Sequence, residues 1–162
     1  MTFDPVALLR LLAAHGVRYV LIGGQAARLL GSPLMSLDLD ICYDRAPDNL
    51  DALAAALREC EARLRGVDED VPFLLDARTL RNGDSFTFET RYGPLDVLAT
   101  PSGTRGYPDL APAARPMDVG GVSVPVVALN DLIRMKTAAG RVKDRLAVEE
   151  LLALRDERRE ER

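Results

Sequence analysis

The sequence predicts an α/β (α+β) fold in which a mixed β-sheet is flanked by helices. Two observations carry this prediction. Segments with the apolar period of a helix are interleaved with short runs rich in β-branched and aromatic residues. Two pairs of such runs are separated by glycine-containing turns at 91–94 and 120–121, which predicts hairpins and therefore antiparallel strands. A regular succession of parallel βαβ units would not contain these hairpins.

The first half of the chain alternates helical and extended patterns. The apolar period, with Gly16 as a stop, predicts a helix over 3–15. Short apolar runs predict two strands, the first of them central in the sheet. Helical periodicity returns after each strand, and Pro47 suits the first turn of the longer helix. The elements expected after the first helix are strand 18–22, helix 24–30, strand 37–43 and helix 47–64.

The second half is expected to contain both hairpins and a helical C-terminal region. A Gly- and Pro-rich stretch predicts a loop with a helical turn, and helical periodicity broken at Gly140 predicts two helices. The segment 155–162 contains only charged residues, so we interpret it as a frayed helical end outside a single domain over 1–154. The expected elements are strand 71–75, strands 86–90 and 95–99, loop 101–112, strands 117–119 and 122–124, and helices 129–139 and 142–154.

Length, charge and residue composition exclude several classes of protein. The chain has 162 residues, enough for one domain with a real core. Its formal net charge of −4 argues against a protein that coats nucleic acid non-specifically. No apolar run reaches the roughly 20 residues that span a bilayer, the N-terminus lacks a secretory pattern, and two cysteines form no disulfide framework. We therefore expect a cytoplasmic protein with no membrane partner. The single histidine, His15, excludes a Ser-His-Asp hydrolase of the usual form.

Two aspartates one residue apart are the most informative feature of the chain. In an extended strand side chains alternate between faces, so Asp38 and Asp40 point the same way. Asp96 lies in a later strand and joins them if the strands are neighbours. Carboxylates on one face repel each other unless a cation lies between them, and hard oxygen ligands favour Mg²⁺ or Mn²⁺. The alternative is the solvated face of an edge strand, although aspartate is disfavoured in strands. The pattern favours a divalent-metal site formed by Asp38, Asp40 and Asp96.

Gly23 and Gly24 follow a strand directly and open a helix. Glycines at such a point let a phosphate approach the backbone and the free N–H groups of the helix start. A tight strand-to-helix turn without a ligand explains the same pair. Ser32 and Ser36 flank the loop before the aspartates, and either hydroxyl could contact a phosphate. There is no G-x-G-x-x-G and no Walker lysine, so neither a dinucleotide fold nor a P-loop is supported.

A basic stretch near the C-terminus contains Arg134, Lys136, Arg141, Lys143 and Arg145. A solvated helix face with salt bridges to nearby aspartates explains it as well as phosphate binding does. Lys136 is the member that we select as functional. On a helix its base leans on apolar residues one turn earlier while its ammonium group reaches outward.

Taken together, these motifs resemble the DNA polymerase β-like nucleotidyltransferase superfamily. The resemblance covers roughly residues 16–153 and implies a minimal nucleotidyltransferase fold with C-terminal helices. Several segments are similar to the small bacterial AbiEii/MenT-like branch, whose members are often toxins of toxin–antitoxin pairs. These segments are 23–27, 31–33, 36–41, 93–98, 132–136 and Lys143 with Asp144.

The resemblance implies a role for each candidate residue. Gly23 and Gly24 would hold the triphosphate of an NTP, with Ser36 as a further nucleotide contact. Asp38 and Asp40 would bind a pair of metal ions, Mg²⁺ or Mn²⁺, and Asp96 would complete the site and orient or deprotonate the attacking hydroxyl. Lys136 would hold the phosphates or neutralise the leaving pyrophosphate. The residues in these roles are Gly23, Gly24, Ser36, Asp38, Asp40, Asp96 and Lys136.

The function expected from the resemblance is a metal-dependent nucleotidyltransferase that moves NMP from an NTP onto a hydroxyl. The tRNA 3′ end is the expected acceptor, and the protein would be the toxin of a pair with an antitoxin protein. A protein side chain or a small antibiotic is an alternative acceptor. A non-catalytic nucleotide- or partner-binding module of the same fold is the competing class. A purely structural domain would leave the paired aspartates unexplained.

Overall fold

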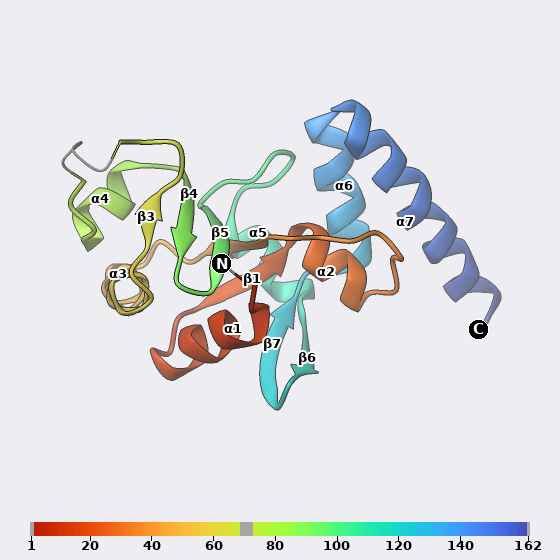
Figure 1. Ribbon diagram of the computed structural model, residues 1–162. Coiled ribbons are helices and arrows are strands. Elements are labelled where there is room, and N and C mark those ends of the chain that lie inside the picture. The colour runs from red at the N-terminus through yellow and green to blue at the C-terminus, as the bar shows by residue number, and fades with distance from the viewer. Residues whose placement is uncertain (1, 69–72, 162) are drawn as a thin grey trace.

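The computed structural model describes residues 2–68 and 73–161, and its strands in this part form one mixed sheet (Figure 1). The strands are β1 Tyr19–Ile22, β2 Leu39–Tyr43, β3 Arg63–Leu64, β4 Ser85–Thr90, β5 Gly93–Leu98, β6 Arg115–Val119 and β7 Val122–Val126. Their order across the sheet is β3-β4-β5-β2-β1-β7-β6. The pairs β1–β7 and β2–β5 are parallel, and the other neighbours are antiparallel. The predicted fold class and both predicted hairpins are confirmed.

Helices surround this sheet. They are α1 Pro5–Ala14, α2 Gly23–Leu29, α3 Pro47–Glu59, α4 Ala77–Asn82, α5 Tyr107–Leu110, α6 Leu129–Ala139 and α7 Val142–Glu160, with a short 3₁₀ turn over Ala111–Ala113. In Figure 1, α1 lies against β7, α2 covers β1 and β2, α6 packs beside α2, and α7 lies on the outer side of α6. The core lies under the central strands, where Leu21, Leu39 and Ile41 are fully buried. Within the described residues no helix combines the length and the apolar character needed to cross a membrane.

The region between α3 and β4 differs from the sequence prediction. The helix expected to reach residue 64 ends at Glu59, because Glu61 adopts a left-handed conformation (φ 57°) and the chain turns back to form β3. The expected strand 71–75 lies partly outside the described residues, and its described part, 73–75, is not a strand. Helix α4 was not predicted. Asp76 is its N-cap, because the Asp76 carboxylate accepts a hydrogen bond from the Thr79 N–H at 2.8 Å.

The charged C-terminal segment is helical, since α7 continues to Glu160. Its far end contacts the turn after α2. The Arg158 guanidinium donates to the Leu30 carbonyl at 2.7 Å. Gly31 packs so closely on α7 that a Cβ there would lie 3.0 Å from the Leu154 side chain. The last turns of α7 therefore connect to the rest of the molecule rather than project freely.

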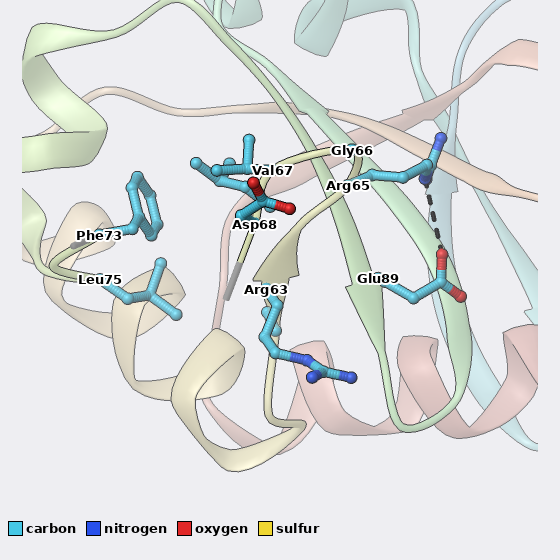
Figure 2. A pocket seen from close by; sticks show the side chains of 10 residues that line it. Arg63, Arg65, Gly66, Val67, Asp68, Phe73, Leu75 and Glu89 are labelled. Carbon is cyan, nitrogen blue, oxygen red and sulfur yellow. Dashed lines mark ion pairs between the residues drawn. The ribbon is translucent and has the colours of Figure 1, made fainter. Parts of the chain in front are cut away.

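A hollow of about 760 Å³ lies at the β3 edge of the sheet. Figure 2 shows Phe73 and Leu75 on one side of it and Arg65 with Glu89 on the other. The Arg65 Nε lies 3.6 Å from a Glu89 carboxylate oxygen. Arg65 and Glu89 also line a second cavity on the neighbouring strands, so the two hollows share a side.

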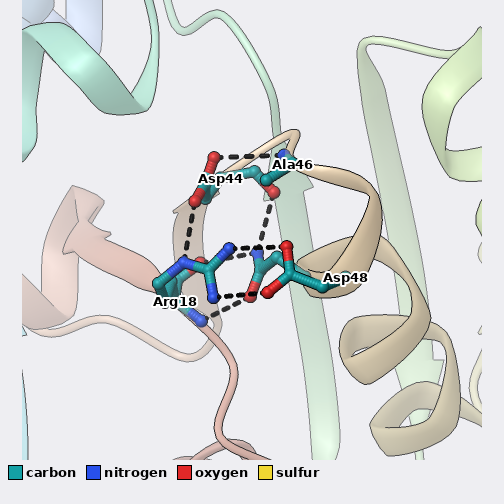
Figure 3. Close-up of polar contacts among 5 residues, drawn as sticks. Arg18, Asp44, Ala46 and Asp48 are labelled. Carbon is teal, nitrogen blue, oxygen red and sulfur yellow. Dashed lines mark hydrogen bonds and ion pairs between the residues drawn. The ribbon is translucent and has the colours of Figure 1, made fainter.

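A polar network fixes the start of β1 against α3 (Figure 3). The Arg18 guanidinium donates to Asp44 at 2.8 Å and to both carboxylate oxygens of Asp48 at 3.0 Å. The buried Asn49 side chain accepts from the Arg18 N–H at 2.6 Å and donates to the Arg18 and Asp44 carbonyls at 2.9 and 2.7 Å. Because Arg18 and Asp44 flank the paired strands β1 and β2, this network aligns the two strands that lead to the aspartates.

Replacing Asn49 by alanine is expected to lower the free energy of unfolding by about 2 kcal/mol, because backbone groups of Arg18 and Asp44 lose their buried partner. Urea denaturation followed by circular dichroism measures this loss. Asn82→Ala, at an exposed position in α4, is the matched control and should change the midpoint little. Equal midpoints for the two variants would contradict the structural role of the network.

Candidate active site

Three carboxylates converge on one face of the sheet. In the parallel pair β2–β5, Asp40 lies directly opposite Asp96. Asp38 immediately precedes β2, and one carboxylate oxygen from each of the three aspartates lies within 4.8 Å of the other two. The neighbouring position of the two strands, which the metal interpretation requires, is therefore present. We refer to Asp38, Asp40 and Asp96 as the acidic trio.

Asp38 reaches the trio in a different way from the one predicted. The strand expected from residue 37 begins at Leu39, and Leu37 is exposed rather than packed beneath the sheet. Ser36 orients Asp38 instead, because its hydroxyl lies 3.2 Å from the Asp38 carbonyl and 3.3 Å from its carboxylate. The Gln25 amide in turn donates to the Ser36 carbonyl at 2.9 Å. A loop tied to α2, not strand alternation, sets the direction of Asp38.

The two glycines at the start of α2 make room for these residues. Gly23 has φ +72°, and a Cβ on it would overlap the Asp40 carboxylate. A Cβ on Gly24 would lie 2.6 Å from the Ser36 hydroxyl oxygen. Gly23 and Gly24 are thus packed against Asp40 and Ser36, which is a steric reason for glycine that the sequence did not reveal. The backbone turn and the acidic trio form one compact unit.

The electrostatics of the trio fit a cation. Burial and the neighbouring Asp38 and Asp96 carboxylates raise the pKa of Asp40 from 3.8 to about 8. Burial also raises the pKa of Asp96, whose carboxylate accepts a hydrogen bond from Asp40 when Asp40 is protonated. Without a metal ion, burial and the charge of its neighbours therefore favour the protonated form of Asp40 at neutral pH. Oxygen ligands in this arrangement fit Mg²⁺ or Mn²⁺, so the residues present suit the expected metal.

Lys136 lies at the same site, on α6. Its ammonium group lowers the pKa of Asp40 by charge attraction, although burial and the carboxylates outweigh it. The Lys136 Nζ lies 3.5 Å from Asp144, a carboxylate that is 1% exposed at the start of α7. The Arg141 Nε also donates to Asp144, at 2.6 Å, and lowers its pKa. Asp144 therefore holds two cations of the predicted basic stretch next to the trio.

Arg65 belongs to the site but was not predicted from the sequence. Its guanidinium donates to Asp96 at 3.1 Å and to the Phe88 carbonyl at 3.0 Å. This arginine follows β3 directly, and it lies one residue beyond the end of the helix predicted over 47–64. No local motif marks it, because only the pairing of β3 with β4 brings it beside β5.

The trio opens into a cavity of about 920 Å³, a size typical of ligand sites. The structure brings all the predicted site residues to this cavity. They are Gly23, Gly24, Ser36, Asp38, Asp40, Asp96 and Lys136, and Ser32, Arg65, Arg141, Lys143 and Asp144 also line it.

Comparison with solved structures supports a nucleotidyltransferase fold. The lincosamide antibiotic adenylyltransferase LnuA, in its lincomycin-bound crystal structure, superposes with a TM-score of 0.64 at 13% sequence identity, over 95% of this chain and 99% of LnuA. The Thermotoga maritima protein TM1012, named as a candidate nucleotidyltransferase, gives 0.57 at 16% identity, over 94% of this chain and 96% of its own. No protein-family profile and no curated protein sequence matches the chain. At these identities the likeness establishes the fold.

Proposed function

We propose that the protein is a metal-dependent nucleotidyltransferase that transfers NMP from an NTP to a hydroxyl group. The observation that carries this proposal is the convergence of Asp38, Asp40 and Asp96 in an open cavity. Carboxylates that would otherwise need protons to coexist are the expected ligands of a divalent cation. The fold shared with LnuA and TM1012 supports the same reaction class.

In this reaction the acceptor oxygen forms a bond to the α-phosphorus of the NTP. The bond from that phosphorus to the bridging oxygen of the β-phosphate breaks, and pyrophosphate leaves. Mg²⁺ or Mn²⁺ bound by the acidic trio would polarise the phosphate and neutralise charge on the attacking and departing oxygens. The protein otherwise acts by positioning and charge neutralisation.

The residues of the chain have distinct roles in this proposal. Asp38 and Asp40 hold metal, and Asp96 completes the metal site and takes up the proton of the attacking hydroxyl. Lys136 holds the phosphates and neutralises the pyrophosphate. The backbone of Gly23 and Gly24 faces the triphosphate.

Ser36, Asp144 and Arg65 are positioning residues in this proposal. Ser36 orients Asp38 through its hydroxyl contacts. Asp144 holds Lys136, and Arg65 holds Asp96.

Two acceptors follow from the resemblances. The likeness to the AbiEii/MenT-like branch suggests the tRNA 3′ end as acceptor, and with it a cytoplasmic toxin neutralised by an antitoxin. LnuA is an adenylyltransferase of a lincosamide antibiotic, so a small molecule is the second acceptor to test.

A non-catalytic nucleotide-binding module is the competing function. Arg65 supports it, because its guanidinium already pairs with Asp96 at 3.1 Å. A permanently paired Asp96 would be a poor proton acceptor. Turnover, rather than binding, separates the two functions.

The test is incubation of the protein with α-³²P-labelled NTPs and Mg²⁺, in separate reactions with total RNA, total protein and a small-molecule extract. We expect label to enter one fraction, with stoichiometric release of pyrophosphate and no transfer when EDTA removes the metal. NTP binding without label in any fraction and without pyrophosphate would favour the non-catalytic module.

A further inference from the structure

The cavity of the acidic trio has a side that the proposed chemistry does not use. Apolar side chains of the loop after α2 and of α7 form it. We refer to this set as the apolar wall. It consists of Leu34, Met35, Leu37, Leu146, Ala147 and Leu151.

Most of the apolar wall is open to solvent. Leu34 is 45% exposed, Met35 82%, Leu37 68% and Leu146 62%. Only three other large hydrophobic side chains in the described part of the chain are exposed, Val67, Leu74 and Val142, and none of them lines this cavity. Exposed apolar groups gathered around one cavity mark a binding site rather than ordinary surface.

The wall is held in place at both ends of its loop. The Arg158 guanidinium donates to the Leu30 carbonyl, and Gly31 packs against Leu154, so the loop starts against α7. At the other end the Gln25 amide holds the Ser36 carbonyl. Figure 1 shows this loop running out on the side where α6 and α7 lie. The groove between loop and helix is therefore built into the fold.

The positions of the charged side chains indicate which class of ligand this groove can bind. The cations that line the cavity are Arg65, Lys136, Arg141 and Lys143, and all come from outside the apolar wall. Three of them face carboxylates, since Arg65 pairs with Asp96 while Lys136 and Arg141 pair with Asp144. A polynucleotide is held mainly through cations along its phosphates. The wall offers apolar contact instead.

We propose that the apolar wall is the acceptor subsite, and that the acceptor is a small hydroxyl-bearing molecule with an apolar face. This inference rests on the proposed nucleotidyltransferase function. The acceptor's apolar face lies on Leu37 and Leu146, and its hydroxyl points to the acidic trio. At about 920 Å³ the cavity lies near the upper end of the about 300–1,000 Å³ typical of ligand sites, which leaves room for a second molecule beside the nucleotide.

A matched pair of probes tests the subsite. Octyl β-glucoside below its micelle concentration and methyl β-glucoside carry the same hydroxyl groups, but only the first has an apolar body. Each is titrated into leucine-methyl-labelled protein with Mg²⁺ and a non-hydrolysable ATP analogue, and NMR shifts report affinity and place. We expect octyl glucoside to shift the methyl signals of Leu37 and Leu146, and methyl glucoside to bind at least about tenfold more weakly.

Substitutions inside and outside the apolar wall provide the control for the probe experiment. The double change Leu37→Ser with Leu146→Ser should weaken octyl glucoside binding by about tenfold, which is the loss expected from two apolar contacts. Leu74→Ser, at a leucine that is 72% exposed and outside the cavity, should leave the affinity unchanged. Equal binding of the two glucosides, or equal effects of the two sets of substitutions, would overturn the inference.

Labelled-NTP turnover separates this inference from the proposed function. Transfer to RNA that the Leu37→Ser/Leu146→Ser protein retains at the wild-type rate would overturn the subsite and leave the transferase intact. Absence of transfer to every acceptor, together with the expected octyl glucoside pattern, would count against the transferase and overturn the acceptor role, leaving the apolar wall as a ligand site only.

Discussion

Replacing Asp40 by asparagine is expected to abolish transfer while making the metal-free protein more stable at pH 8. Asp40 is the central member of the trio, opposite Asp96 and in electrostatic contact with Asp38. Loss of the metal's transition-state stabilisation, several kcal/mol, corresponds to about a thousandfold lower turnover. Removal of one of three crowded negative charges relieves their repulsion. Asp40→Asn should therefore lower turnover and raise the stability of the metal-free protein.

The pH dependence of stability shows at which pH values Asp40 stabilises the metal-free protein. The pKa of Asp40 rises from 3.8 to about 8 on folding, so between these values the folded state binds a proton that the unfolded state has lost. The stabilisation from Asp40 is complete below the lower value and is lost as the pH rises to about 8. Thermal unfolding of the metal-free protein should therefore show a falling midpoint from pH 5 to pH 8. Asp40→Asn should flatten this fall.

Bound metal should reverse which of the two proteins, the wild type or Asp40→Asn, has the higher unfolding midpoint at pH 8. Mg²⁺ or Mn²⁺ should raise the unfolding midpoint of the wild type at pH 8 and leave that of Asp40→Asn almost unchanged, because only a folded protein with its ligands gains from binding. Asp51→Asn, at an exposed position on α3, is the control and should behave as the wild type. A variant that keeps its turnover, or wild-type stability that rises from pH 5 to pH 8 without metal, would contradict the metal site.

Gly23→Ala is expected to lower turnover by about a hundredfold, because the new methyl group displaces the Asp40 carboxylate and a misplacement near 1 Å has that effect. The residue also has φ +72°, so the substitution strains the backbone whatever the space around it. Initial rates with saturating NTP measure the loss of turnover. The midpoint of thermal unfolding measures the loss of stability from backbone strain.

Gly16→Ala is the control that separates backbone strain from displacement of the Asp40 carboxylate. Gly16 has nearly the same conformation, φ +66°, but nothing lies within 4 Å of a Cβ built there. Both variants should lose stability through backbone strain, Gly23→Ala by more because its methyl group also displaces Asp40, and only Gly23→Ala should lose activity and Mn²⁺ affinity. If Gly16→Ala reduced turnover equally, backbone strain alone would explain the glycine at position 23.

The sequence was sufficient for the features that depend on local pattern. The hairpins β4–β5 and β6–β7 and the helices α1, α2, α6 and α7 follow from periodicity and glycine turns, which are properties of neighbouring residues. The sequence also marked Asp38 and Asp40 as partners, but strand alternation was the wrong reason, because Asp38 lies in a loop before β2. The meeting of Asp40 with Asp96 was an assumption, because no local signal specifies which strands lie side by side.

The remaining features depend on tertiary context. Arg65 reaches Asp96 only because α3 stops early, at a turn where Glu61 takes a conformation usual for glycine. Leu37 looked like a buried strand residue from its apolar neighbours, yet it is 68% exposed in a loop held by Gln25 and Ser36. Hydrophobicity alone cannot distinguish a core side chain from one that lines an open groove.

The parallel pairing of β2 with β5 links chemistry to folding. Its register matches Leu39 with Leu95, Asp40 with Asp96 and Ile41 with Val97. A slip of one residue would send Asp96 to the reverse side of the sheet and expose the leucine and valine beside it. Burial of those neighbours therefore selects the same alignment that assembles the trio. A molecule that completes its central sheet in this register has Asp40 and Asp96 in position from that moment, and only Asp38 still depends on the loop held by Gln25 and Ser36.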